Sequence, residues 1–178
     1  MKTISALKSV AIAAAFVGVS LSASAATTNL GAVSASVPTS FGGFASGSFS
    51  DIFTFSLPAN SGSGYSVVNF PLSTSGGTFN VLLTGLGLFS NPDGIVGNTD
   101  DSYVTAASGN SNALSFSFAN TPAGNYYLQV FGVTTGSLGG IYTGAISITP
   151  VPEPETFAML LAGLGVMGAI ARRRKIQG

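Results

Sequence analysis

The sequence contains no cysteine, so no disulfide can stabilise its fold. It contains no histidine either, and the two absences exclude Ser–His–Asp and Cys–His nucleophilic sites and His-ligated zinc. All six basic residues lie near the ends of the chain, at Lys2, Lys8 and Arg172–Lys175. The body between them therefore has no cation to set against phosphates, and we expect it to bind neither nucleic acid nor an anionic membrane surface.

Carboxylates are scarce as well, because the body has no glutamate and only four aspartates, Asp51, Asp93, Asp100 and Asp101. A glycosidase needs only a pair of carboxylates, so this chemistry is not excluded by composition. Three of the four aspartates share one short segment, which leaves Asp51 with that segment as the one plausible pair. We therefore expect the protein not to be an enzyme.

The first 25 residues have the three parts of a secretory signal peptide. Lys2 and Lys8 provide the positive start, Val10–Leu21 provides a short apolar stretch, and Ala23 and Ala25 provide a small-x-small cleavage site. This pattern predicts a signal peptide over residues 1–25, removal by signal peptidase, and a mature chain that begins near Ala26.

The last segment, residues 151–178, also has three parts in a fixed order. The proline-rich, acidic run Val151–Glu155 is followed by sixteen uncharged residues, Thr156–Ala171, and then by a basic tail over residues 172–175. As a helix, sixteen residues span about 24 Å, and flanking arginines can extend their side chains toward the membrane surface. We predict a single transmembrane helix over residues 156–171, with both basic ends of the precursor on the cytoplasmic side.

This end of the chain resembles the PEP-CTERM sorting signal. The resemblance is carried by Pro152, Glu153 and Pro154, by the apolar helix, and by Arg172, Arg173 and Arg174. It implies recognition by exosortase, a membrane transpeptidase or protease of cysteine type, with cleavage at or near Pro-Glu-Pro, and a bacterium that makes exopolysaccharide, biofilm or floc. A permanent tail anchor is the alternative.

Residues 26–150 have the pattern of an all-β domain, with Gly, Ser and Asn separating short runs of alternating apolar residues. In residues 113–118, for example, Leu114, Phe116 and Phe118 face one way and two serines face the other. Residues 26–48 are rich in small side chains and fit either a loose leader or an edge strand. The other strands that we predict are Gly47–Leu57, Tyr65–Pro71, Thr78–Leu83, Ser102–Ala106, Ala113–Phe118, Asn125–Val133 and Tyr142–Thr149.

Asp51 is the most informative residue of the body. In a regular strand it shares a face with Phe49, Phe53 and Phe55, and a carboxylate on an apolar face is costly unless its oxygens are satisfied. Because the body has no Lys, Arg or His, the partners of Asp51 must be backbone N–H groups, hydroxyls, water or a metal. We favour backbone donors, and calcium coordination is the alternative.

The motif Phe49-x-Asp51-x-Phe53 resembles the FxDxF family of PEP-CTERM proteins. More distantly, the segment 51–55 together with residues 123–130 and 140–142 resembles the bacterial pre-peptidase C-terminal domain. This second resemblance implies a jelly-roll-like antiparallel β-sandwich that binds surfaces or polysaccharide, or supports secretion.

The segment 91–101 is a second candidate site, because Asp93, Asn98, Asp100 and Asp101 offer oxygens within eleven residues. A solvated turn is the favoured interpretation, since Asn and Asp readily bond their own backbone. Calcium is the alternative, with Asp51, Asp93, Asp100 and Asp101 as its candidate ligands, and we expect no other cofactor.

Two functions remain open for the exported body. It is either a structural component of the cell surface or of an exopolysaccharide matrix, or a calcium-dependent carbohydrate-binding or adhesive module. Five tyrosines are available to stack on sugar rings, although strand tyrosines more often pack in a core. They are Tyr65, Tyr103, Tyr126, Tyr127 and Tyr142.

Overall fold

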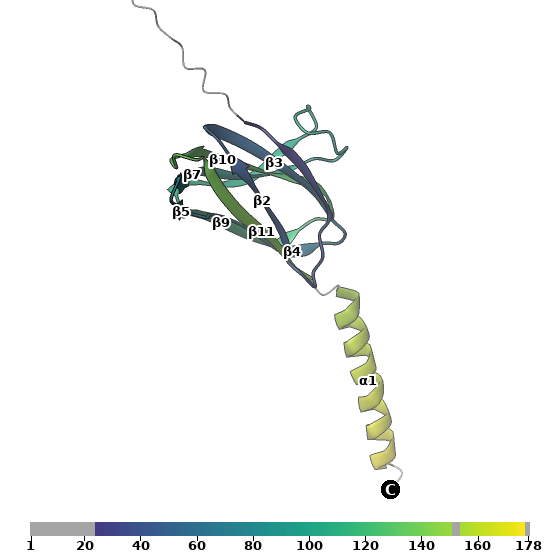
Figure 1. Cartoon of the computed structure of the whole chain (residues 1–178). Coiled ribbons are helices and arrows are strands. Elements are labelled where there is room, and N and C mark those ends of the chain that lie inside the picture. The colour runs from purple at the N-terminus through teal and green to yellow at the C-terminus, as the bar shows by residue number, and fades with distance from the viewer. Residues whose placement is uncertain (1–23, 151–153, 177–178) are drawn as a thin grey trace, which may run out of the picture.

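The computed structural model describes residues 24–150 and 154–176. The first stretch folds into two facing β-sheets, and the second forms helix α1, Pro154–Ile176 (Figure 1). The strands are β1 Thr27–Ala32, β2 Thr39–Ala45, β3 Ser48–Leu57, β4 Ser61–Asn69, β5 Leu72–Thr74, β6 Gly77–Phe79, β7 Val81–Ser90, β8 Ser102–Ser111, β9 Ala113–Thr121, β10 Gly124–Thr134 and β11 Gly140–Pro150.

The larger sheet has the strand order β1-β3-β10-β7-β8 and the smaller one β2-β11-β4-β9, while β5 and β6 form a separate hairpin. Every pairing between strands is antiparallel except that of β1 with β3. The prediction of an all-β sandwich built from antiparallel sheets is therefore confirmed.

The core forms where the inner faces of the two sheets meet. Along β3 every second residue is buried, namely Phe49, Asp51, Phe53, Phe55 and Leu57. Aromatic side chains cross between the sheets, because Phe49 on β3 stacks on Tyr142 of β11 at 5.1 Å and Phe53 packs against Phe41 of β2 at 4.7 Å. The shared face that the alternation predicted for Phe49 to Phe55 is confirmed.

The residues 26–48 contain two strands, and both lie at sheet edges. β1 lies at the edge of the larger sheet, and β2 at the edge of the smaller one, where its register runs from Thr39 opposite Ile146 to Ala45 opposite Gly140. The edge-strand interpretation of this segment is therefore confirmed. Side chains in β1 are mostly exposed, which explains why no apolar alternation revealed it.

The structure corrects the sequence-based interpretation of two segments, residues 78–83 and residues 62–64. The segment 78–83 is divided at Asn80, whose backbone N–H donates to Gly139 O and whose carbonyl accepts from the N–H groups of Thr135 and Gly136. Asn80 is thus bonded to a loop instead of to a strand ladder, so β6 ends before it and β7 begins after it. The Gly62-Ser63-Gly64 segment has a composition typical of a turn, but it lies at the start of β4, with Gly62 paired to Thr149 of β11.

Helix α1 begins at Pro154, a position where the missing N–H of proline costs no helical hydrogen bond. Its described apolar side chains are exposed, Met159 by 76% and Leu161 by 69%. The prediction over residues 156–171 is confirmed as a helix but not as a membrane span, and the helix extends beyond these residues in both directions. Across the described residues, no helix has the combined length and hydropathy of a membrane span.

Candidate functional site

Asp51 lies in the middle of β3 and points into the core. Its side chain is 4% exposed, and both carboxylate oxygens accept hydrogen bonds. The backbone N–H of Ala26, just before β1, donates to Oδ1 at 2.9 Å, and the hydroxyl of Tyr142 on β11 donates to Oδ2. The carboxylate therefore connects three strands and both sheets, which fits the favoured prediction of a satisfied structural carboxylate.

The same contact changes the acidity of Tyr142. Burial raises the pKa of its phenol, and the hydrogen bond to Asp51 and the negative charge of that carboxylate raise it further. The phenol is therefore held in its neutral form, in which it can donate its proton to Asp51. The sequence left a hydroxyl open as one possible partner of Asp51, but Tyr142 lies 91 residues away along the chain, so no local pattern could select it.

Asp51 is not brought together with the other three aspartates. It lies opposite Val130 of β10. The loop 91–101 connects β7 to β8 and contacts the start of β10, where Asn91 N donates to Asn125 O. Val130 lies five residue steps beyond Asn125 along the strand, a distance of about 17 Å. Over the described stretches, no three residues of the types His, Cys, Asp and Glu lie close enough together to hold a metal ion.

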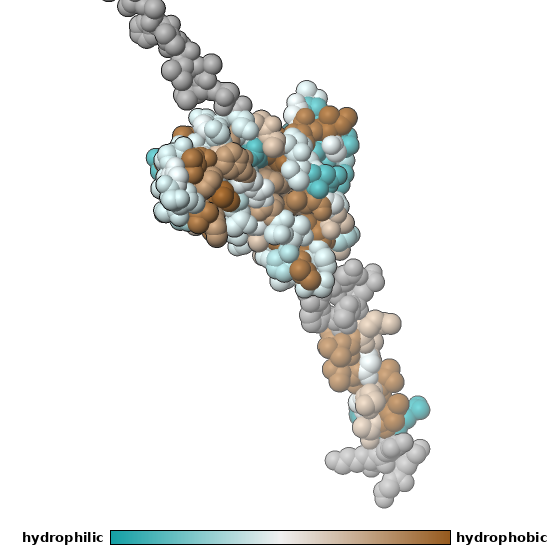
Figure 2. Space-filling model, in the orientation of Figure 1, coloured by the Kyte–Doolittle hydropathy of each residue, from teal (hydrophilic) through white to brown (hydrophobic). Residues whose placement is uncertain are grey.

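The loop 91–101 is organised by its own side chains. Asp93 Oδ1 accepts from the N–H of Ile95 at 2.8 Å, and Asp93 Oδ2 accepts from Asn98 Nδ2 at 2.8 Å. Asp101 Oδ2 accepts from the N–H of Gly97 at 2.6 Å. This network is what a turn built by Asn and Asp predicts. In Figure 2 the loop, at the upper right of the sandwich, carries a concentration of strongly hydrophilic surface.

Three side-chain oxygens of this loop are nevertheless buried without a hydrogen-bond partner: Asn91 Oδ1, Asn98 Oδ1 and Asp101 Oδ1. Asn91 itself is only 1% exposed. All three atoms are acceptors, so they cannot satisfy one another, and a donor or a cation is needed. Asn91 was not among the residues that the sequence singled out, because a buried amide cannot be distinguished from a turn asparagine in the sequence.

Tyr127 of β10 is the titratable group that responds to this loop. Burial raises the pKa of its phenol, and the nearby Asp101 carboxylate adds to the effect. The ring stacks on Phe89 at the end of β7, with 4.8 Å between ring centroids. The Asp101 carboxylate therefore lies close to the phenol of Tyr127.

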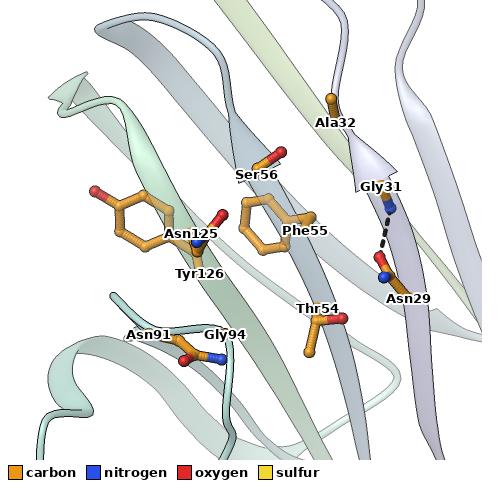
Figure 3. A pocket seen from close by; sticks show the side chains of 10 residues that line it. All are labelled: Asn29, Gly31, Ala32, Thr54, Phe55, Ser56, Asn91, Gly94, Asn125 and Tyr126. Atoms are coloured by element: carbon orange, nitrogen blue, oxygen red, sulfur yellow. Dashed lines mark hydrogen bonds between the residues drawn. The ribbon is translucent and has the colours of Figure 1, made fainter.

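An open pocket of about 230 Å³ lies beside the loop (Figure 3). Amides, hydroxyls and two aromatic rings line it, and no charged residue does. Asn29 closes one wall, where its Oδ1 accepts from the N–H of Gly31 at 2.8 Å. The other residues that line the pocket are Gly31, Ala32, Thr54, Phe55, Ser56, Asn91, Gly94, Asn125 and Tyr126.

Four of the five tyrosines belong to the interior. Tyr65, Tyr126, Tyr127 and Tyr142 are between 1% and 6% exposed, whereas Tyr103 of β8 is 64% exposed. The five therefore do not form a common surface for stacking on sugars, and packing is their main role.

The predicted processing residues are described in part. Ala25 is exposed and lies directly before the residue that bonds Asp51, whereas Ala23 lies outside the described residues. Pro152 and Glu153 also lie outside them, and Pro154 is the first residue of α1. Arg172 and Arg173 are exposed in the last turns of the helix, which also contains Arg174.

Comparison with protein-family models shows two matches that fit this arrangement. Residues 49–132, from β3 to β10, match the bacterial pre-peptidase C-terminal domain, and residues 150–175 match the PEP-CTERM protein-sorting motif. The end of the chain thus carries a match to the PEP-CTERM protein-sorting motif, and its body is similar to the bacterial pre-peptidase C-terminal domain. The motif marks an extracellular protein that exosortase sorts, made as an exported, membrane-anchored precursor.

Solved structures resemble the fold at low similarity. The pre-peptidase C-terminal domain of a collagenase from Bacillus anthracis is 21% identical, with a TM-score of 0.40, over 69% of this chain and 94% of that one. PliG, a periplasmic inhibitor of g-type lysozyme from Aeromonas hydrophila, is 18% identical, with a TM-score of 0.38, over 71% of this chain and 100% of that one. No curated protein matches the sequence.

Proposed function

We propose that this protein is a non-enzymatic structural component of the bacterial cell surface or of an exopolysaccharide matrix. In this proposal signal peptidase removes residues 1–25, helix 156–171 holds the precursor in the membrane, and exosortase releases the jelly-roll-like sandwich near Pro152–Glu155. The observation that carries the proposal is the sorting motif over residues 150–175. The membrane segment is supported by sixteen consecutive uncharged residues, and by arginines that can extend to the interface from a helix of about 24 Å.

The surface of the sandwich supports a structural role. Most outward residues on β4, β9 and β11 are small and uncharged. A shallow groove there is lined by Gly64, Tyr65, Ser66, Ser115, Phe116, Ser117, Ala145 and Ser147. Such a face can pack against a neighbouring chain or a neutral polysaccharide without bringing together charges of like sign. The proposal that the protein is not an enzyme is supported by the absence of His and Cys from the sequence and of Lys from the body.

Intact-mass spectrometry of the protein recovered from its native host tests the sorting proposal. We expect a chain that begins near Ala26 and ends between Pro152 and Glu155. Bulk product that still carries Arg172–Lys175 would contradict processing by exosortase. A product that lacks the tail but stays in the cell envelope would place the protein at the surface instead of in the released matrix.

A second candidate function is a calcium-dependent binding module, and the three unpartnered oxygens of the loop 91–101 favour it. Calcium prefers carboxylate and amide oxygens, and a site with few carboxylates in an extracellular domain binds at about 10⁻⁴–10⁻³ M. On this hypothesis Asn91, Asn98 and Asp101 are the ligands, with Asp93 and Asp100 nearby. Asp51 is not a ligand, because Ala26 and Tyr142 occupy its two oxygens.

The variant Asn98→Asp separates an ion site from a solvated turn. The substitution replaces the amide that donates to Asp93 by a second carboxylate. Without calcium, repulsion between the two carboxylates should lower the melting temperature. If calcium binds here, the added charge increases the affinity, and calcium raises the melting temperature of Asn98→Asp more than that of the wild type. Asn120→Asp is the control, since Asn120 is exposed on β9 and its substitution adds the same charge outside the loop. If calcium changes the melting temperature of neither the wild type nor Asn98→Asp, the site is excluded. Glycan-array binding measured with and without calcium tests the associated function.

A further inference from the structure

The negative charge of Asp51 has no positive partner anywhere in the body. Its carboxylate is 4% exposed, between Phe49 and Phe53 on the core face of β3. Residues 26–150 contain no Lys, Arg or His. Neutral donors satisfy both oxygens, but a buried charge held only by neutral donors is less stable than one that also has a counter-charge close to it.

One of these donors has an unusual position in the sequence. The N–H of Ala26 lies 2.9 Å from Asp51 Oδ1, and the carbonyl of the same residue accepts from Ile52 N at 2.7 Å. Two bonds to neighbouring residues of β3 therefore hold the Ala26 backbone in place immediately before β1. The bond that joins Ala25 to Ala26 is the one that the Ala23-x-Ala25 pattern marks for signal peptidase.

Cleavage of that bond changes the charge of the nitrogen. Hydrolysis adds water across the Ala25–Ala26 amide, so Ala25 leaves with a carboxylate and Ala26 keeps an amine, which takes up a proton at neutral pH. The resulting ammonium has three N–H donors where the amide had one. Ala26 is exposed, so one donor can stay on Asp51 while the other two face water.

We propose that removal of the signal peptide creates the counter-ion of Asp51: the α-ammonium of Ala26 forms an ion pair with the Asp51 carboxylate at the start of β1. The inference rests on the cleavage site of the proposed export pathway. It makes the precursor and the mature chain different in stability although their sandwich is the same. It also assigns Asp51 a second role, as the group that fixes the new N-terminus to the larger sheet.

Cleavage also removes two backbone bonds, from Ser24 N to Ser48 O and from Ser50 N to Ser24 O. These are neutral bonds at an exposed edge, whereas the new contact is charge-assisted and reaches a buried carboxylate, which makes it the stronger kind.

The groups that face Asp51 are the nitrogen of Ala26 and the phenol of Tyr142, and the phenol remains neutral while the amine titrates. Stabilisation by the pair is therefore present below the usual pKa of the amine, about 8, and is lost as pH rises through the raised pKa of the folded chain.

Two chemical modifications of the chain recovered after export test the ion pair without any mutation. Acetylation turns the α-amine into a neutral amide like that of the precursor, whereas reductive dimethylation keeps the positive charge and one N–H. We expect acetylation to lower the melting temperature at neutral pH and dimethylation to preserve most of it. In Asp51→Asn the two modified forms should melt alike, and in the control Asp100→Asn they should differ as in the wild type.

The outcomes separate the ion pair from the export proposal. Equal melting temperatures for the acetylated and dimethylated wild-type chains would overturn the pair, whatever Asp51→Asn does and even if that variant fails to fold. A native mass that places the N-terminus at a residue other than Ala26 would overturn both the pair and the predicted cleavage site. A correct mass with no effect of acetylation would leave the export proposal intact and remove only the pair.

Discussion

The hydroxyl of Tyr142 on β11 donates a hydrogen bond to Oδ2 of Asp51 on β3, and this bond connects the two sheets through the core. The contact is reinforced by the stacking of the Tyr142 ring on Phe49. Tyr142 is 1% exposed, so water cannot replace the hydroxyl if it is removed.

Tyr142→Phe should lower the free energy of unfolding by about 1–3 kcal/mol, because it leaves a buried carboxylate oxygen without a donor while the ring packing stays the same. Urea denaturation measures the change. Tyr103→Phe is the matched control, since Tyr103 is 64% exposed and should change stability by less than about 0.5 kcal/mol. Equal effects of the two substitutions would show that the Asp51 contact adds no stability.

The buried tyrosines predict a loss of stability at high pH. Burial raises the pKa of Tyr65, Tyr126 and Tyr142 in the folded chain above the ordinary value of 10.0. The unfolded chain therefore releases these protons first, so the stabilisation is complete below pH 10 and is lost as pH rises above it. Unfolding followed between about pH 8 and pH 12 should show this decline, with a smaller slope in Tyr142→Phe. A stability that does not change over this range would contradict burial of the phenols.

Gly132 on β10 should not accept a side chain. A Cβ at this position would lie 2.5 Å from Cζ of the Phe49 ring and 2.9 Å from the carbonyl oxygen of Leu82. Gly132→Ala should therefore destabilise the sandwich by about 1–3 kcal/mol through overpacking. Ser115→Ala, at an exposed position of β9, is the control and should be nearly neutral in thermal denaturation. A neutral Gly132→Ala would mean that the Phe49 ring can move aside.

The sorting motif predicts a change in product mass. Replacement of Pro152 and Glu153 by alanine should leave the C-terminal segment attached, so the product should be heavier and should stay with the membrane fraction. Glu155→Ala leaves the motif intact and should be processed like the wild type. Wild-type processing of the double variant would assign cleavage to some other feature of the chain.

The sequence predicted well the parts of the fold that depend on alternation. Phe49, Phe53 and Phe55 were placed on one face, and that face is the core. The sequence-based prediction failed where backbone hydrogen bonds decide the structure. The predicted strand 78–83 is interrupted at Asn80 because Asn80 is bonded to a loop 55 to 59 residues further along the chain. Glycine is also misleading as a turn signal: Gly62 belongs to a Gly-Ser-Gly segment, but it lies in a strand where its neighbours leave little room for a side chain.

The candidate site was predictable in type and not in detail. The absence of cations from the body left backbone N–H groups, hydroxyls, water or a metal as partners of Asp51, and the structure shows a backbone and a hydroxyl donor. Which residues supply them depends on the pairing of β11 and β1 with distant strands, and no local pattern encodes that pairing. The unpartnered oxygen of Asn91 was missed for a similar reason, since its burial results from the fold of the whole loop.

The short connection between the sandwich and the helix limits where the processing enzyme can act. β11 ends at Pro150 and α1 begins at Pro154, so a tether of four residue steps joins them, with a reach of about 14 Å even when fully extended. In the proposed precursor, a helix held in the membrane would keep the sandwich within that distance of the bilayer surface. An enzyme that cuts between the two would then have to act close to the lipid headgroups.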